Sequence, residues 1–194
     1  MTARVSLSEK FQTVGLGFWL YLMTDMMLFA SLFATYIVLK SGTADGPAAH
    51  DLFDPQYALI ETLLLLTSSF MCGLAYLAAR RKNRQAALSF LFGTLLLGVG
   101  FLWLEVQEFH AFATAGHSWQ TSAFLSGFFT LVGTHGAHIA IGLIWGLAIT
   151  LYLLLRGISD DLLCKFGMFA LFWHFLDVVW IFIFTIVYLL GAAS

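Results

Sequence analysis

The chain has 194 residues, of which 60% are hydrophobic and only 10% are charged, and its formal net charge is −2. Because soluble domains carry about 25% charged residues, this composition excludes a water-soluble globular protein and indicates an integral membrane protein. Cys72 and Cys164, the two cysteines, both lie in or next to apolar stretches and favour neither a disulfide framework nor a metal site.

Five apolar segments follow a short polar arm at residues 1–14. Each is long enough to cross a membrane, which takes about 20 apolar residues in a helix. The segments are 15–39, 55–79, 85–108, 121–155 and 164–190. Their uninterrupted apolar character lacks the alternation of barrel strands, so we predict an all-α integral membrane protein with a bundle of five transmembrane helices. The fourth would be about 52 Å long and must tilt or project beyond the bilayer.

The distribution of lysine and arginine predicts the orientation of this bundle. If the N-terminus is cytoplasmic, the inner loops hold eight cations and the outer loops hold only Lys40. The eight are Arg4, Lys10, Arg80, Arg81, Lys82, Arg84, Arg156 and Lys165. This bias predicts a cytoplasmic N-terminus and, after five crossings, a periplasmic C-terminus.

Two single carboxyl residues, Asp25 and Glu61, lie inside the first and second segments. An ionisable group in lipid costs on the order of a few kcal/mol, so it needs an internal partner or a function. No lysine or arginine lies in the interior of any segment, and these carboxyls must therefore hydrogen-bond to other side chains or stay protonated. We favour a structural hydrogen bond for both, with a proton-handling role as the alternative for Asp25.

Three pairs of polar residues stand three positions apart, a spacing that puts both members on one helix face. The pairs are Glu105 with Glu108, His135 with His138, and His174 with Asp177. Histidines on neighbouring helices can ligate iron, copper or haem, but the Glu-x-x-His motif of di-iron bundles is absent. We therefore expect an internal polar network that joins the third, fourth and fifth helices, with no catalytic, cofactor or metal site on the chain.

Glycines are concentrated in the fourth segment, at positions 127, 133, 136, 142 and 146. Small residues allow helices to approach closely in lipid, where no hydrophobic force drives their association. Close helix packing is the favoured interpretation, and a ligand groove is the alternative.

Three stretches carry a family resemblance: FWHFLDVVW at 172–180, GTHGAHIAIG at 133–142 and LEVQEF at 104–109. Together they resemble subunit III of haem-copper terminal oxidases, and the match extends over nearly the whole chain. The five segments are similar to the short bacterial form, which lacks the first two helices of the mitochondrial type. Residues 17–25 and the loop at 41–47 look most like the bo-type ubiquinol oxidase branch.

The resemblance implies a non-catalytic, supporting role in the bacterial inner membrane. Family members bind no haem or copper themselves; they pack against subunit I, where haems and copper reduce oxygen to water, and subunits II and IV are further expected partners. Their helices form a V-shaped cleft that holds phospholipid. Asp25 matches the position of a carbodiimide-reactive glutamate in the cytochrome c oxidase branch, where the subunit supports proton uptake.

The leading hypothesis is therefore the subunit III of a proton-pumping quinol oxidase. The same subunit of a cytochrome c oxidase is the alternative, since the choice of electron donor is made elsewhere in the complex. A remote alternative is a membrane cytochrome or metalloenzyme that uses His135, His138 and His174. A small transporter is disfavoured by the odd number of segments and the lack of an internal repeat.

Overall fold

The computed structural model describes residues 7–40, 42, 55–116 and 120–192, and the regular secondary structure in these ranges is helical. The elements are α1 (Leu7–Leu39), α3 (Pro55–Arg80), α4 (Arg84–Thr114), α5 (Ala123–Arg156), α6 (Asp160–Ile183), the π-helical turn η1 (Phe184–Leu189) and α7 (Leu190–Ala192). Within the described residues, five helices are long and apolar enough to cross a membrane. The predicted all-α fold with five membrane-spanning helices is therefore confirmed.

The helices extend beyond the apolar segments at several ends. α1 begins at Leu7 rather than at residue 15, although its membrane-compatible stretch begins only at Thr13. α4 continues to Thr114 rather than ending at residue 108, because no glycine or proline occurs between residue 108 and Gly116. Gly116 has a φ of 83°, a conformation that favours glycine and suits the chain reversal beyond the helix.

Side-chain caps define where three of the helices begin. Asn83, Ser122 and Ser159 each accept a hydrogen bond from the backbone N–H three residues later, at the start of α4, α5 and α6. Such caps satisfy N–H groups that the first turn of a helix leaves unpaired. The cap at Ser159 explains why α6 starts at Asp160, four residues before the expected apolar segment.

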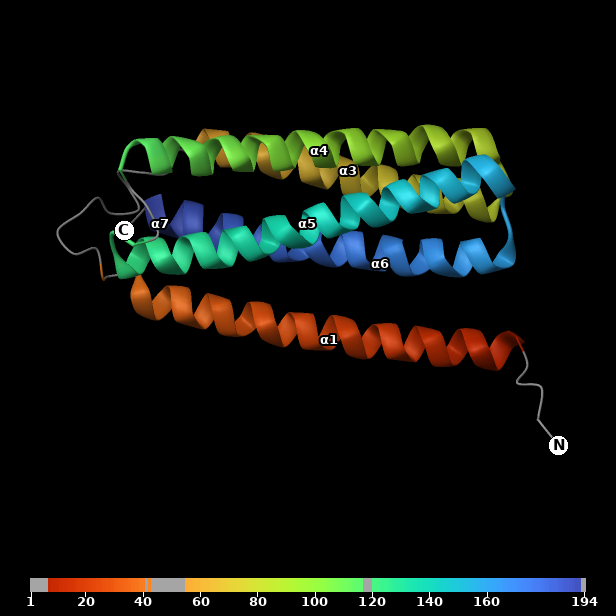
Figure 1. Ribbon diagram of the computed structural model, residues 1–194, viewed down its shortest axis with the longest axis horizontal. Coiled ribbons are helices and arrows are strands. Elements are labelled where there is room, and N and C mark those ends of the chain that lie inside the picture. Colours follow the sequence, from red (N-terminus) through yellow and green to blue (C-terminus); the bar gives the residue numbers. More distant parts are fainter. Residues whose placement is uncertain (1–6, 41, 43–54, 117–119, 193–194) are drawn as a thin grey trace.

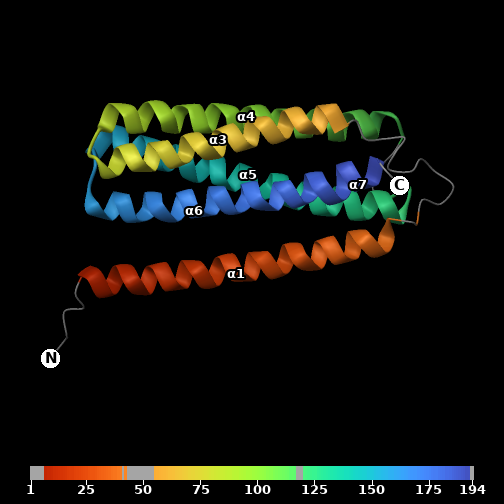
Figure 2. The same ribbon diagram turned by 180° about the vertical axis from the view of Figure 1, so that it is seen from behind.

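α3 and α4 form a hairpin, α5 and α6 lie beside it, and α1 stands on the far side of α5 and α6 (Figures 1 and 2). α5, with 34 residues, is about 50 Å long and runs obliquely from the side of α1 toward the start of α4 (Figure 1). α6 contacts α1, α3 and α5. The stretch 172–180, which carries the family resemblance, thus lies on the helix that joins the other parts of the bundle.

The inner-loop cations from Arg80 to Lys165 lie at one end of the bundle. The α3–α4 turn and the α5–α6 turn lie at the same end as the start of α1 (Figures 1 and 2). Arg84 joins the two turns, because its guanidinium donates to the carbonyl oxygens of Leu153 and Leu154 at 3.1 and 2.6 Å. These carbonyls belong to the last turn of α5, where a cation also complements the helix dipole.

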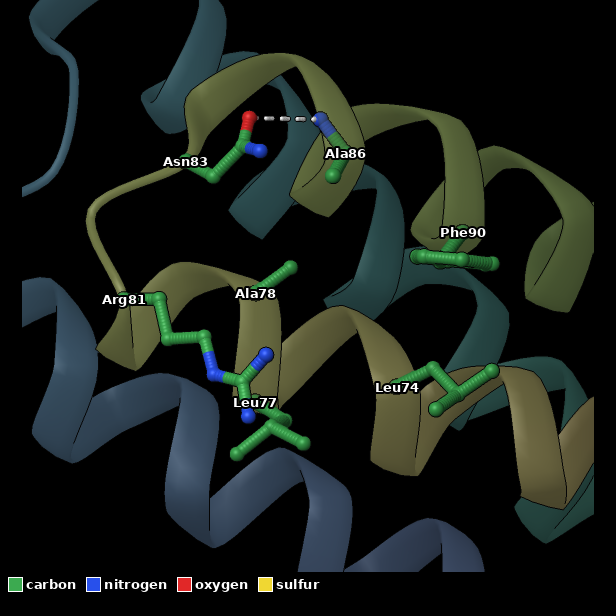
Figure 3. A pocket seen from close by; sticks show the side chains of 7 residues that line it. All are labelled: Leu74, Leu77, Ala78, Arg81, Asn83, Ala86 and Phe90. Atoms are coloured by element: carbon green, nitrogen blue, oxygen red, sulfur yellow. Dashed lines mark hydrogen bonds between the residues drawn. The ribbon is translucent and has the colours of Figure 1, made fainter.

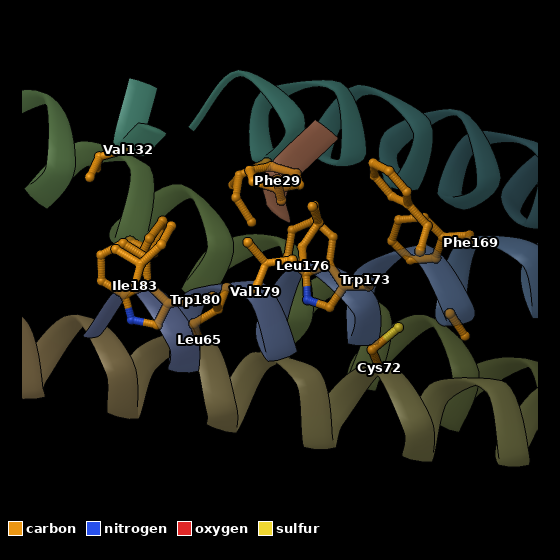
Figure 4. Close-up of a cluster of buried hydrophobic side chains, with 14 of the residues drawn as sticks. Phe29, Leu65, Cys72, Val132, Phe169, Trp173, Leu176, Val179, Trp180 and Ile183 are labelled. Carbon is orange, nitrogen blue, oxygen red and sulfur yellow. The ribbon is translucent and has the colours of Figure 1, made fainter. Parts of the chain in front are cut away.

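Trp173 fills the interior between three helices. Its ring is fully buried and lies against Gly98 of α4 and Gly142 of α5, where an added Cβ atom would come within 2.9 and 2.8 Å of ring carbons. The indole Nε1 donates to Oγ of Ser68 on α3 at 2.9 Å. Figure 4 shows Trp173 and Trp180 apart along α6, with Leu176 and Val179 between them and both indole nitrogens directed toward α3.

The close-packing interpretation of the α5 glycines is confirmed at three of the five positions. An added Cβ atom at Gly136, Gly142 or Gly146 would lie only 2.6 to 2.8 Å from a neighbouring side chain. At Gly127 and Gly133 the nearest atoms would be at 3.5 and 3.6 Å, which is ordinary van der Waals contact. Close approach of α5 to its neighbours thus depends on the middle of the helix and on its second half.

Candidate functional site: polar groups buried between the helices

Asp25 and His138 face each other across the interface between α1 and α5. The Asp25 side chain is buried, and its Oδ2 lies 3.7 Å from Nε2 of His138. Nδ1 of His138 donates to the carbonyl oxygen of Thr134 at 2.7 Å, which leaves Nε2 to face the carboxyl. The hydroxyl of Tyr21, one turn earlier on α1, also interacts with Asp25. This contact places an acid and a base together inside the bundle.

His174 and Asp177 connect α6 to α3. Nδ1 of His174 and Oγ of Ser69 share a hydrogen bond of 2.6 Å. Asp177 is buried and interacts with the same hydroxyl and with His174. One serine of α3 therefore meets both members of this predicted pair.

The two tryptophans that flank this pair make matching contacts with α3. Nε1 of Trp173 donates to Ser68, and Nε1 of Trp180 donates to Oγ1 of Thr62 at 3.0 Å. Ser68 in turn donates to the carbonyl oxygen of Thr94 on α4 at 3.1 Å. Each buried indole N–H thus has the partner that its burial requires. Through Ser68, a chain of two hydrogen bonds connects α6 to α3 and α3 to α4.

His135 makes a different connection from its partner in the i,i+3 pair. It is fully buried, and its Nε2 donates to the backbone carbonyl of Leu176 on α6 at 3.2 Å. The rings of Phe101 and Trp180 lie 5.8 and 5.3 Å from the imidazole, measured between ring centroids. His135 is therefore a packed, hydrogen-bonded link between α5 and α6.

Glu105 and the partly buried Glu108 lie near the buried carboxyl of Glu61 on α3. Oε2 of Glu108 accepts a hydrogen bond of 2.6 Å from the hydroxyl of Tyr188 in η1. Glu61 and Glu105 are buried, and their carboxyl oxygens have no hydrogen-bond partner among the described residues. All three carboxyls are close enough to interact electrostatically.

The six residues of the predicted network thus lie in separate places. His138 faces α1, His174 and Asp177 face α3, His135 reaches the backbone of α6, and the two glutamates lie with Glu61. Across the described ranges, no three His, Cys, Asp or Glu side chains converge in a way suited to a metal ion. The three histidines of the metalloenzyme alternative therefore point to three different helices.

Comparison with known proteins places this arrangement in a family. A family model described as cytochrome c oxidase subunit III matches residues 8–192. The chain belongs to the cytochrome c oxidase subunit III family. This confirms the resemblance seen in the three sequence stretches.

Relatives within the subunit III family carry names from both quinol and cytochrome c oxidases. The chain is 51% identical over 181 residues to the cytochrome bo(3) ubiquinol oxidase subunit 3 of Pseudomonas putida, covering 93% of this chain and 87% of the relative. It is 47% identical over 176 residues to the quinol oxidase subunit 3 of Bacillus subtilis, covering 91% and 86%. It is 49% identical over 178 residues to the cytochrome c oxidase subunit 3 of Bacillus sp. (strain PS3), covering 91% and 85%.

In this subunit III family member, the sequence did not single out the α3 side chains that meet α6. Thr62, the partner of Trp180, and Ser69, the partner of His174, stand seven residues apart on α3, and Ser68, the partner of Trp173, is next to Ser69. Trp173 and Trp180 are likewise seven residues apart on α6. Residues at this spacing share one helix face. In the sequence, one face of α3 carries hydroxyl side chains and one face of α6 carries tryptophans. These two patterns could have predicted that α3 packs against α6.

Proposed function

We propose that this chain is subunit III of a proton-pumping haem-copper quinol oxidase, an accessory subunit that supports the enzyme without carrying its chemistry. The near-full-length match to the bo(3) ubiquinol oxidase subunit carries the proposal. In it, subunit I is the main partner and holds the haems and copper, and subunits II and IV complete the complex. Subunit III of a cytochrome c oxidase is the second candidate, favoured by the similarly close relative from strain PS3.

Purification of a tagged form of the chain from its own membranes tests this proposal. We expect a complex that contains haem and copper in other subunits and that oxidises ubiquinol but not reduced cytochrome c. Oxidation of cytochrome c instead would favour the second candidate. Stoichiometric haem or metal on the chain separated from its partners would contradict both.

The orientation in the bacterial inner membrane is part of the proposal. A cytoplasmic N-terminus and a periplasmic C-terminus follow from the positive-inside rule, since the end of the bundle with the α3–α4 and α5–α6 turns collects arginine and lysine. Protease accessibility of terminal tags in inverted and right-side-out vesicles distinguishes the two orientations.

In this proposal the buried polar residues hold the helices together. Each of four inter-helix contacts uses a member of the predicted network: Asp25 with His138, His174 with Ser69, His135 with Leu176, and Glu108 with Tyr188. Hydrogen bonds between membrane helices contribute about 0.6–2 kcal/mol each, which applies to the last three contacts; Asp25 and His138, at 3.7 Å, are within ion-pair distance only. Such contacts stabilise a supporting subunit and leave the oxygen chemistry to its neighbour.

Asp25→Asn tests a proton-handling role for the carboxyl beside His138. The amide keeps the size of the side chain but cannot release a proton, so we expect assembly to be retained while turnover or its pH dependence changes. The measurement is oxygen consumption by the purified complex as a function of pH. Ser31→Ala, an exposed position on the same helix, is the control. A variant with normal assembly and an unchanged pH profile would remove this role from Asp25.

Phospholipid binding is the remaining part of the proposed function. We place the lipid-holding, V-shaped cleft alongside α1, which packs against α5 and α6 and presents large apolar side chains outward. Met23, Met26 and Met27 of α1 are 60 to 75% exposed, as expected for side chains that face lipid.

A groove at the α3–α4 turn supports lipid binding at a second place (Figure 3). It has a volume of about 170 Å³, and its walls include Leu74, Leu77 and Phe90, with Arg81 at the turn. No acidic residue occurs between Glu61 and Glu105 in the sequence, so the charged side chains at the α3–α4 turn are all positive. An apolar groove ending at a guanidinium suits an acyl chain and its phosphate.

Arg81→Gln is expected to weaken binding of an anionic phospholipid to the complex. A basic residue near an anionic headgroup contributes about 1 kcal/mol, which corresponds to roughly a fivefold loss of affinity. Native mass spectrometry of the complex with phosphatidylglycerol, and with phosphatidylcholine for comparison, measures the change. Arg156→Gln removes the same charge at the other turn and should have a smaller effect. Equal lipid retention in both variants would contradict binding at this groove.

A further inference from the structure

Four buried carboxyl oxygens lack hydrogen-bond partners in one part of the bundle. They are both carboxyl oxygens of Glu61 and both of Glu105, and no described residue donates a hydrogen bond to any of them. Glu61 is 0% exposed and Glu105 is 2% exposed. Burial of an unpaired polar group costs about 1–3 kcal/mol, and more if the group is charged. A stable bundle therefore needs donors for these oxygens that the described residues do not provide.

The carboxyl of Glu105 packs closely against α5 at a glycine. It lies against Gly136 of α5, where an added Cβ atom would be 2.8 and 2.9 Å from the two carboxyl oxygens. Glu105 also lines a hollow of about 240 Å³ between α4 and α5, together with Val106, Phe109 and Gly133 among others. An unpartnered, fully buried carboxyl thus faces a space large enough for several water molecules.

The three carboxyl groups at this site cannot all be charged, so at least one of them must carry a proton. Neither lysine nor arginine occurs between Arg84 and Arg156, so no cation of these helices neutralises the glutamates. Glu108 lies in the same cluster and interacts with Glu61 and Glu105. Three carboxylates that share a site in a medium of low dielectric cannot all be ionised.

Among the described residues, Tyr57 and Tyr188 also interact with the cluster. Both hydroxyl protons are already used, because Tyr57 donates to the carbonyl oxygen of Leu104 at 3.1 Å and Tyr188 donates to Glu108 at 2.6 Å. The phenols therefore leave the oxygens of Glu61 and Glu105 without donors.

We propose that Glu61, Glu105 and Glu108 form a hydrated carboxylic acid cluster that binds water and at least one exchangeable proton, with the hollow between α4 and α5 as its access. Water supplies the missing donors and relays protons between the carboxyls. Apolar lipid chains in the same hollow offer no donor to Glu105. The site is separate from the Asp25–His138 contact, and its existence does not depend on which electron donor the oxidase uses.

Infrared spectroscopy of the intact complex in lipid tests the protons. We expect carbonyl stretching bands of protonated glutamate at neutral pH, a shift to lower frequency on exchange into D₂O, and loss of one band in Glu105→Gln. Asp161→Asn, which removes an exposed carboxylate paired with Lys165, should leave these bands unchanged. A wild-type spectrum without a Glu105-dependent band, or a band that does not shift in D₂O, would overturn the proposal.

Radiolytic footprinting of the unmodified complex tests the water and needs no variant. Hydroxyl radicals formed from bound water should oxidise Val106 and Phe109, which line the hollow, several-fold faster than Val99 and Leu96 on the same helix. Equal, slow oxidation of all four would mean a dry hollow and would overturn the proposal. In the infrared experiment, loss of the carbonyl bands on addition of sodium chloride but not of potassium chloride would show that a metal cation replaces the proton. That result would also overturn the proposal.

Discussion

Trp173→Ala is expected to lower the free energy of unfolding by about 3–5 kcal/mol. The indole is fully buried between Gly98, Gly142 and α3, so its removal leaves a cavity where two glycines provide no side chain to fill it. The substitution also leaves the hydroxyl of Ser68 without the indole N–H that it accepts. The measurement is thermal unfolding of the purified complex, with release of this chain followed by gel filtration.

Two further variants separate the contributions of Trp173. Trp173→Phe keeps an aromatic ring but loses the N–H donor, so it should recover part of the stability and lack about 1 kcal/mol. Trp103→Ala removes an indole that is 64% exposed on α4 and should change stability by no more than about 0.5 kcal/mol. A Trp173→Ala complex as stable as the wild type would show that this interface does not hold the bundle together.

Gly142→Ala is expected to destabilise the bundle by about 1–3 kcal/mol, the usual cost of overpacking. The new methyl group would lie 2.8 Å from Cζ3 and 3.0 Å from Cε3 of Trp173. The ring has no room to retreat, because its far edge already lies against Gly98, within 2.9 Å of where a Cβ would be. The helices α5 and α6 must therefore separate, which the same thermal measurement detects.

A second glycine and a double variant serve as controls for Gly142→Ala. An added Cβ at Gly100 of α4 would meet nothing within 4 Å, so Gly100→Ala should be neutral or stabilise the helix by about 0.5–1 kcal/mol. In the Trp173→Ala background, Gly142→Ala should cost less, because the two closest ring atoms are gone and only Cε1 of Phe172, at 3.2 Å, still lies close to the added Cβ. Additive losses in the double variant would contradict the proposed contact.

The number and approximate extent of the helices were predictable from the sequence. In lipid a backbone must satisfy its own hydrogen bonds, so each apolar stretch of sufficient length forms a helix whatever its neighbours are. The helix ends were less predictable, because α1 begins among polar residues and α4 continues beyond Glu105 and Glu108 to Thr114. There the end depends on breakers such as Gly116 and on caps such as Ser159, and hydropathy does not report these.

The sequence predicted which polar residues lie within the helices of the bundle, but not which helices they contact. The i,i+3 spacing correctly puts His174 and Asp177 on one face, and both meet Ser69. The same spacing did not keep His135 and His138 together, because one imidazole turns toward α6 and the other toward α1. Side chains three residues apart differ in direction by about 60° when the helix turns by about 100° per residue, which suffices to reach different neighbours in a crowded bundle.

The sequence by itself determined that the chain has five segments long and apolar enough to cross a membrane, that its lysines and arginines fall mostly in alternate loops, and that it belongs to the subunit III family. The tertiary structure alone decided which helices the polar groups join, including Trp173 with Ser68 and Glu105 with Gly136. The physical reason is that lipid makes nearly every helix face apolar, so periodicity does not mark the buried side. The contacts of small residues with large rings and carboxyls mark it, and those contacts join residues far apart in the chain.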